Sequence, residues 1–352
     1  MAAGVMRVGI DGNCLRHPLG GVARYVEGLL KFLPAVRGRD ALRISVLAPD
    51  SVHATMPWVL WHMQRASGGA FDALHFPFYY PCLFPRCPIT VAIHDVLVIE
   101  HPEWFPRAWA AATAALLRHG SRRAAAIVTG SAAVAAAIES LCGVPRERVA
   151  VIPYGVDPAT FGPPSAAGEA AARARFGLER PFLLQTGAFE PRRGLELSIE
   201  AARAAREVVG DLELVLAGDA RGEVQGLKRA PAFVRRLGRV GDRDLAALFP
   251  AAAAVLAPSY GEGFDLPVLE ALACGAAVIA SDIPVHVEHF AGAVELFAGG
   301  DADALAQACL RVLTDGARRA ALRAAGPRLA AGYTWQECAE RHAALWSQVR
   351  GS

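Results

Sequence analysis

The stretch AVLAPSYGEGFDLPVLEALACGAAVIASD, residues 254–282, reads as a strand, a glycine loop, a helix and a second strand. The apolar runs at 254–259 and 276–282 are typical of buried strands. Pro267 suits the first turn of the helix between them, and Gly275 suits its end. A strand, a helix and a further strand in this order form the repeating unit of a parallel sheet.

The same alternation of apolar runs and helical segments continues through both halves of the chain. Further strands are expected at residues 5–11, 42–48, 73–76, 89–95, 125–131, 149–155, 181–187, 212–219, 233–240 and 293–298. Further helices are expected at residues 23–33, 109–119, 132–141, 195–208, 244–252, 301–326 and 334–350. We therefore expect an α/β chain with two doubly wound, Rossmann-like domains, in which helices cover both faces of each parallel sheet.

A change in composition indicates where the first domain ends. Residues 158–177 consist mainly of proline, glycine, serine and alanine without a strand pattern, which favours a linker and a lead-in helix. We predict domains over residues 1–160 and 161–333, and a helix over 334–352 that packs back on the first domain. Because parallel strands present ligand-binding loops at their carboxyl ends, we expect a ligand in a central cleft that the two domains face.

Composition and charge exclude several classes of protein. The chain has 352 residues, 53% of them hydrophobic, and a formal net charge of +2, which provides no basic field for nucleic acid. It lacks a secretory signal and any apolar run of membrane-spanning length, so we expect a cytoplasmic protein. Seven scattered cysteines fit reduced thiols rather than a disulfide framework or a zinc site. The glycine spacings of dinucleotide-binding and P-loop motifs do not occur.

The loop that precedes the helix of the opening stretch suits an anion. Gly261 and Gly263 allow backbone N–H groups to approach a diphosphate, and the dipole of the following helix favours negative charge there. Glu270 lies among apolar residues, so we expect it to be buried with a polar partner such as a sugar or ribose hydroxyl. The residues alone leave a second interpretation open, in which Glu270 only complements the helix dipole and the loop is a simple turn.

The segment EGFDLPVLE, residues 262–270, resembles the two-glutamate signature of retaining glycosyltransferase family 4, whose members have the GT-B fold. The resemblance covers nearly the whole chain. It includes GIDGNCLRHPLGGVARYVEGLL (9–30), VAIHD (91–95), VIPYGVD (151–157), LLQTGAFEPRRGLELSIEA (183–201) and SDIPVHVEHFAGAVELF (281–297). Together these segments are similar to the subgroup that contains bacterial mannosyltransferases of surface polysaccharide assembly.

The resemblance implies an enzyme that moves a hexose, with mannose from GDP-mannose favoured, from a nucleoside diphosphate sugar to a glycan, lipid-linked or small-molecule hydroxyl. It implies four catalytic residues, namely His94, Arg192, Arg193 and Glu262. It implies donor-binding roles for Gly20, Gly21, Gly263, Phe264, Asp265, Leu266, Glu270 and Glu288. In this assignment Glu262 holds the donor sugar, Glu270 holds the ribose and the arginines offset charge on the diphosphate, so no metal and no other cofactor are expected.

Two positions depart from the family pattern. The family usually has glycine where Asp265 stands and lysine where Arg193 stands. Asp265 is expected either to contact a sugar hydroxyl or to repel phosphate. Arg193 keeps the positive charge and adds a planar fork, so phosphate binding is expected to survive.

Other readings of the chain stay open. One alternative is a sugar-nucleotide-binding protein that has lost transfer activity, and another is a GT-B epimerase or phosphorylase. A basic group could touch an anionic membrane surface if the acceptor is lipid-linked, or could form a solvated helix end; it comprises Arg118, His119, Arg122 and Arg123.

Overall fold

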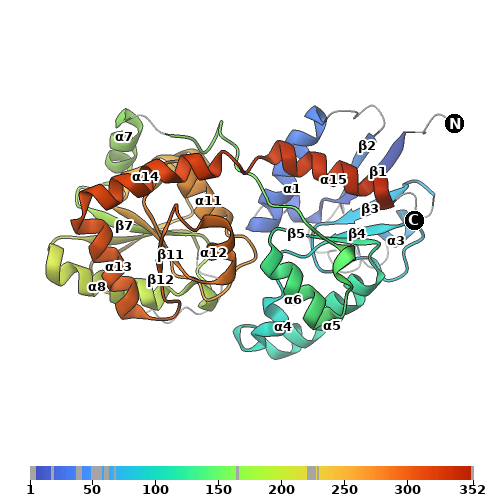
Figure 1. Ribbon diagram of the computed structural model, residues 1–352, viewed down its shortest axis with the longest axis horizontal. Coiled ribbons are helices and arrows are strands. Elements are labelled where there is room, and N and C mark those ends of the chain that lie inside the picture. Colours follow the sequence, from blue (N-terminus) through green and yellow to red (C-terminus); the bar gives the residue numbers. More distant parts are fainter. Residues whose placement is uncertain are drawn as a thin grey trace. The chain divides into compact units, whose positions relative to one another are not determined.

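The computed structural model describes residues 5–16, 20–36, 42–48, 58, 63–66, 69–163, 166–219, 227 and 230–349. The chain forms two compact units, one of residues up to Gly155 together with those from Thr334 onward, the other of Val156 to Tyr333 (Figure 1). The first unit ends earlier than residue 160, because the N–H of Val156 already donates to the carbonyl of Tyr333 at 3.0 Å. Residues 164–165 of the expected linker lie outside the described residues.

The first unit is built on six parallel strands in the order β2-β1-β3-β4-β5-β6. The strands are β1 (Met6–Asp11), β2 (Leu42–Leu47), β3 (Ala73–Phe76), β4 (Ile89–Ala92), β5 (Ala126–Thr129) and β6 (Val149–Val151). The helices are α1 (Gly21–Phe32), α3 (Met63–Ala66), α4 (Leu97–Glu100), α5 (Arg107–Arg123), α6 (Ala132–Cys142) and α15 (Trp335–Val349), with 3-10 turns η1 (Asn13–Arg16), η2 (Leu33–Ala35), η5 (Pro102–Trp104) and η6 (Arg146–Arg148). Strands β3, β4 and β5 are buried throughout, which explains their short, mainly apolar sequences.

The C-terminal helix α15 belongs to the first unit and packs against α1. Gly28 of α1 makes the close approach possible, because a Cβ atom there would lie 2.4 Å from the indole ring of Trp335. A chain of buried polar side chains also ties α15 to the sheet. It runs through Trp346, Thr90, His75, Tyr25 and His342 and ends at the carbonyl of Cys338.

Burial keeps both histidines of this polar chain neutral. It lowers the pKa of His342 to about 4 and holds the pKa of His75 well below its usual range. The carbonyl of Cys338 only accepts, so Nδ1 of neutral His342 donates to it at 2.7 Å and Nε2 accepts from the hydroxyl of Tyr25 at 2.6 Å. The oxygen of Tyr25 then accepts from Nε2 of His75 at 2.9 Å. Each of these polar side chains keeps its hydrogen-bond partner only while the rings of His75 and His342 are both neutral.

The second unit repeats the design, with six parallel strands in the order β12-β11-β10-β7-β8-β9. The strands are β7 (Phe182–Thr186), β8 (Glu213–Ala217), β9 (Val234–Gly238), β10 (Ala254–Ala257), β11 (Val278–Ser281) and β12 (Glu295–Phe297). The helices are α7 (Ala166–Phe176), α8 (Leu195–Val209), α10 (Asp242–Ala251), α11 (Leu266–Ala273), α12 (Pro284–Phe290), α13 (Ala302–Thr314) and α14 (Gly316–Ala330), with the 3-10 turn η7 (Pro191–Arg193).

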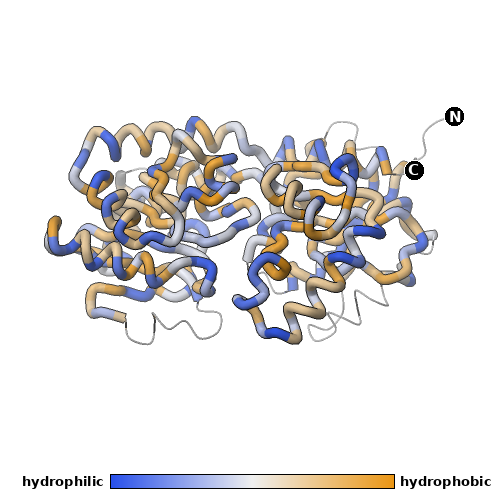
Figure 2. The backbone as a smooth tube through the Cα atoms, turned by 60° about the horizontal axis from the view of Figure 1, so that its bottom comes forward, coloured by the Kyte–Doolittle hydropathy of each residue, from blue (hydrophilic) through white to orange (hydrophobic). Residues whose placement is uncertain are grey.

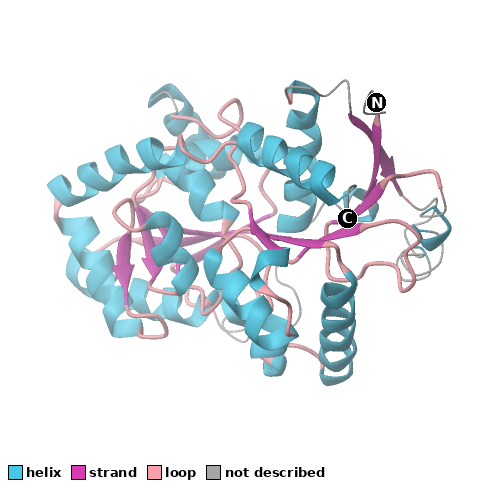
Figure 3. Cartoon of the chain, turned by 45° about the vertical axis from the view of Figure 1, so that its right-hand side comes forward, coloured by secondary structure: helices cyan, strands magenta, loops and turns pink. Residues whose placement is uncertain are grey.

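Helices cover the sheets on both faces, as Figure 3 shows, and the expected doubly wound architecture is confirmed in each unit. Along the covering helices, hydrophobic and hydrophilic residues both occur, as the tube in Figure 2 shows. Helix α8 illustrates the reason, because it buries Leu195, Ile199 and Ala202 while Glu200 and Arg203 stay exposed.

Two details of the helices predicted in the second unit were wrong. The single helix expected at 301–326 is divided into α13 and α14, because Asp315 is extended and its side chain accepts from the N–H of Arg318 at 2.9 Å, which starts a new helix. Helix α12 was not expected at all. It begins at Pro284, whose fixed φ angle suits a first helical turn, and at Pro284–Phe290 it is too short to show a periodic pattern.

Two further expectations concern thiols and membranes. The seven cysteines are all free, as the sequence predicted. Among the residues described, no helix has both the length and the apolar character needed to cross a membrane.

Candidate active site at the carboxyl edge of the second sheet

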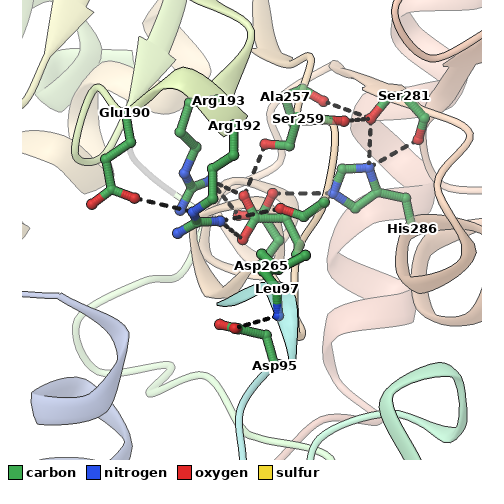
Figure 4. A network of polar contacts seen from close by, with 12 residues as sticks. Asp95, Leu97, Glu190, Arg192, Arg193, Ala257, Ser259, Asp265, Ser281 and His286 are labelled. Carbon is green, nitrogen blue, oxygen red and sulfur yellow. Dashed lines mark hydrogen bonds and ion pairs between the residues drawn. The ribbon is translucent and has the colours of Figure 1, made fainter. Parts of the chain in front are cut away.

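The opening stretch of the sequence forms β10, a loop over residues 258–265, α11 and β11. Strand β10 pairs in parallel with β7 on one side and β11 on the other. Parallel pairing brings the carboxyl ends of the three strands to one edge, so the segments that follow them meet there. Figure 4 shows the resulting network of polar side chains.

Glu262 bridges the two arginines of η7. Its Oε2 lies 2.6 Å from Nη1 of Arg192, and its Oε1 lies 2.8 Å from Nη1 of Arg193. Arg192 also pairs through Nε with Glu190 at 3.0 Å. The side chain of Glu262 is only 5% exposed, so these charge-assisted contacts lie in a partly dry environment where they are stronger than at the surface.

Further hydrogen bonds hold the same two loops together. The hydroxyl of Ser259 donates to Oε1 of Glu262 at 2.8 Å, and the N–H of Tyr260 donates to the carbonyl of Arg192 at 2.8 Å. The side-chain amide of Gln185, on β7, donates to the carbonyl of Arg193 at 2.8 Å. The loop after β10 and the arginine turn after β7 are therefore joined through main-chain as well as side-chain atoms.

Asp265 connects this cluster to α12. Its Oδ1 lies 3.3 Å from Nη1 of Arg193, and its Oδ2 lies 3.1 Å from Nε2 of His286. Burial would raise the pKa of the Asp265 carboxyl, but the charge of Arg193 and the contact with His286 hold that pKa well below its usual range. Because the side chain is 1% exposed, its carboxylate faces protein groups and does not face solvent.

The other predicted donor residues of this unit lie around α11 and α12. Gly263, Phe264 and Leu266 are buried, and the Phe264 ring packs on His289 with 4.7 Å between centroids, so a donor could reach these residues only through their backbone. Glu270 is buried in α11 as expected, with 4% of its surface exposed. Glu288 lies exposed on α12 and is 3.5 Å from Nε2 of His289.

The remaining predicted residues belong to the first unit. Gly20 precedes α1 with a φ angle of 99°, which favours glycine, and Gly21 is exposed at the first position of the helix. His94 follows β4, with its Nε2 2.9 Å from the carbonyl of Pro77 and its Nδ1 2.7 Å from the hydroxyl of Tyr154. A carbonyl only accepts, so Nε2 carries the hydrogen, and burial lowers the pKa of the ring.

The structure thus brings Arg192, Arg193, Glu262 and Asp265 together in one cluster of the second unit. Sequence reasoning missed His286, Ser259 and Ser281, which complete that cluster. The one feature of the sequence that could have indicated His286 was Pro284, which starts the short helix that carries this histidine.

In the described part of the chain, no group of three or more His, Cys, Asp or Glu side chains is placed to hold a metal ion.

Family models match both halves of the chain. One described as "Glycosyltransferase Family 4" matches residues 19–160, and one described as "Glycosyl transferases group 1" matches residues 180–315, which includes the arginine and two-glutamate segments. The chain belongs to glycosyltransferase family 4. The arginine–glutamate cluster is therefore the candidate active site of a glycosyltransferase.

Similar proteins agree with this membership. The glycosyltransferase is 27% identical to O-antigen chain mannosyltransferase B of Escherichia coli over 92% of this chain and 95% of that protein. It is 30% identical to D-inositol 3-phosphate glycosyltransferase of Xylanimonas cellulosilytica over 64% of this chain and 57% of that protein. Anabaena HepE, solved with UDP and glucose, has the same fold with a TM-score of 0.76 and 19% identity, over 98% of this chain and all of HepE. The GT-B fold expected from the sequence is confirmed.

Proposed function

We propose that this glycosyltransferase moves a hexose from a nucleoside diphosphate sugar to a hydroxyl acceptor with retention at the anomeric carbon. The observation that carries the proposal is the bridge of Glu262 between Arg192 and Arg193 beside the first turn of α11. It offers cations and a helix N-terminus to a diphosphate, and a carboxylate to sugar hydroxyls.

Each of these groups has a role in bond cleavage. When the bond between sugar and diphosphate breaks, negative charge grows on the diphosphate, and Arg192, Arg193 and the N-terminus of α11 would stabilise it. Glu262 would hold the donor sugar, and Glu270, buried one turn into α11, would hold the ribose. We also propose His94 as a sugar contact; its two ring nitrogens already have partners, the carbonyl of Pro77 and the hydroxyl of Tyr154.

We favour mannose from GDP-mannose as the donor, because the mannosyltransferase relative matches almost its full length. HepE, by contrast, was solved with UDP and glucose. A thermal-shift panel of GDP-, UDP- and ADP-sugars decides between these donors. The acceptor would be a glycan, a lipid-linked sugar or a small molecule, and the reaction would take place in the cytoplasm.

A lipid-linked acceptor would bring the protein to the inner face of the membrane. Phe84 and Trp109 are 60% and 43% exposed, and Arg123 lies over the Phe84 ring at 5.6 Å. Arg118 and Arg122 are partly used within the unit, because each donates through Nε to a carbonyl at the end of α6. We propose only a weak peripheral contact through the exposed members of this group.

The main alternative is a protein that binds a sugar nucleotide without transferring the sugar. The residues for which the resemblance implies a role, among them His94, Arg192, Glu262 and Glu270, are all present, which speaks against a simple loss of transfer. Incubation with a donor that stabilises the protein decides the matter. Release of nucleoside diphosphate, by hydrolysis or transfer, supports the enzyme, whereas protection of the donor without turnover supports the binder. An epimerase or phosphorylase would instead yield an isomerised sugar nucleotide or a sugar phosphate.

Transfer is expected to proceed in the presence of EDTA. The two arginines and the helix N-terminus would supply the positive charge that a divalent ion supplies in other transferases. Initial rates are compared with EDTA, with EDTA and excess Mg²⁺, and with EDTA and excess Mn²⁺. A rate that disappears with EDTA and returns only with one of these metals contradicts the prediction.

A further inference from the structure

His286 of α12 is completely buried, and both of its ring nitrogens face hydrogen-bond acceptors. Nδ1 lies 2.9 Å from the carbonyl oxygen of Ser281, and Nε2 lies 3.1 Å from Oδ2 of Asp265. The hydroxyl of Ser281, 3.4 Å from Nδ1, supplies no hydrogen, because it donates its own to the carbonyl of Ser259 at 2.6 Å. Each nitrogen of His286 must then donate, which requires an imidazolium.

Asp265 is the acceptor that makes this imidazolium possible. Arg193 lies 3.3 Å from the other oxygen of Asp265, so the carboxylate form is favoured and the proton stays on the ring. A buried charge without a partner would be very costly, and here each charge has one of opposite sign. Cations and carboxylates therefore alternate through the cluster in the order Glu190, Arg192, Glu262, Arg193, Asp265 and His286.

The backbone of Asp265 is strained to reach this position. Its φ angle is 67°, and no other non-glycine residue among those described has a positive φ. A side chain in the left-handed region is unfavourable, although aspartate tolerates it better than most residues. Such strain persists where surrounding contacts fix it, and it often occurs at functional sites. In Asp265 the fixing contacts are those to Arg193 and His286.

Arg193 depends on the contacts at one of its nitrogens. Nη1 lies between Glu262 at 2.8 Å and Asp265 at 3.3 Å, whereas the buried Nε has no hydrogen-bond partner within the described structure. The two carboxylates at Nη1 therefore fix the direction of the guanidinium. Arg193 and Asp265 are also the two positions that differ from the family pattern, and the structure places them in contact.

We propose that Asp265 and His286 are positioning residues that hold Arg193 in the orientation in which it binds the donor's diphosphate. The proposal rests on the function proposed above, because it takes Arg193 as a phosphate ligand. His286 acts through Asp265, which it keeps ionised and fixed, and Asp265 acts through Arg193. The proposal needs no contact between either positioning side chain and the donor, and the side chains of Asp265 and His286 are 1% and 0% exposed.

Three variants test whether Asp265 positions Arg193: Asp265→Gly, Arg193→Lys and the double variant. Glycine adopts the φ angle of Asp265 without strain, so the first removes the carboxylate while sparing the backbone. Lysine keeps the charge but lacks the fork that two carboxylates can orient. Calorimetric titration with GDP, UDP and ADP is expected to show about tenfold weaker binding of the preferred nucleotide for each single variant. The double variant should be no weaker than the weaker single one, because both changes break one contact.

Additive losses in the double variant, of about a hundredfold, would overturn the proposal, as would unchanged or tighter binding by Asp265→Gly. Arg192→Ala separates this outcome from failure of the proposed function. Normal nucleotide binding by Arg192→Ala counts against the phosphate site as a whole. If binding is weakened by Arg192→Ala and not by Asp265→Gly, only the positioning role is wrong.

A spectroscopic readout tests the charge of His286 without any ligand. In the wild-type protein labelled with ¹⁵N-histidine, both ring nitrogens of His286 should show the shifts of nitrogens that carry a hydrogen, because each faces an acceptor. The signal is assigned by its loss in His286→Gln. In Asp265→Gly one nitrogen should shift to the value of a neutral ring. A neutral ring in the wild-type protein, or a ring that stays charged in Asp265→Gly, contradicts the proposed pair.

Discussion

Replacing Arg192 with alanine is expected to weaken binding of the preferred nucleoside diphosphate by about 1.5 to 3 kcal/mol, the contribution of one charge-assisted hydrogen bond. The same loss is expected for Arg193→Ala, since both guanidiniums flank Glu262 at the carboxyl edge of the sheet. Turnover should fall at least as much, because charge on the diphosphate increases in the transition state. Calorimetry with GDP, UDP and ADP, together with initial rates of transfer, measures both effects.

Arg311→Ala is the matched control for this prediction. Arg311 pairs with Glu295 at 2.7 Å in the same unit, but Glu295 is the first residue of β12 and so lies at the opposite, amino end of the strands. This variant should bind the nucleotide as the wild type does, whatever its stability. Unchanged binding and kinetics in both site variants would remove the arginine pair from the donor site.

Acid is expected to destabilise the first unit through the buried histidines of its polar chain. Burial lowers the folded-state pKa of His342 to about 4, whereas the unfolded chain takes up the proton near 6.5. As the pH falls from about 6.5 to 4, the unfolded state therefore gains a proton that the folded state refuses. The free energy of unfolding should fall by about 3 kcal/mol from His342 alone, and His75 should add to the loss.

Asp11 must be removed to see this effect clearly. Burial raises the pKa of Asp11 to about 6, so the folded state binds a proton before the unfolded state does, and its contribution to stability rises as the pH falls. The free energy of unfolding is therefore measured by denaturant titration of the Asp11→Asn variant between pH 7.5 and 4. All six tryptophans lie in the first unit, so their fluorescence reports that unit alone. A free energy of unfolding that does not change over this range contradicts neutral, buried histidines.

The fold was largely predictable because the pattern of apolar runs is itself a consequence of the architecture. Strands such as β4 and β10 are buried from end to end, so their sequences stand out as short apolar segments between helices. The break at Asp315 was not predictable from periodicity, because α13 and α14 both continue a helical pattern on either side of one capping residue. Short α12 left no periodic signal of its own.

The sequence predicted most residues of the candidate site but not the contacts between them. The glycine loop before α11 marked Glu262, and the proline turn after β7 marked the arginines. Glu262 and the arginines come together because β10 pairs with β7, although the two strands are far apart in the sequence. The order of strands in a sheet cannot be predicted from the sequence of any single segment. The contact between Asp265 and His286 was unpredictable for the same reason. It depends on β11, which precedes α12 in the chain, pairing with the other side of β10.

The most direct test of the account compares Glu262→Gln with Glu270→Gln in calorimetry and transfer assays. Glu262→Gln is expected to lose far more in sugar transfer than in binding of the bare nucleoside diphosphate, because an amide cannot accept hydrogen bonds at both of its ends. Glu270→Gln should bind both the nucleoside diphosphate and the intact donor more weakly, through its loss of the ribose contact. If Glu270→Gln binds nucleotide normally and merely unfolds at a lower temperature, while Glu262→Gln transfers sugar at the wild-type rate, the assignment of this loop and helix to the donor is contradicted.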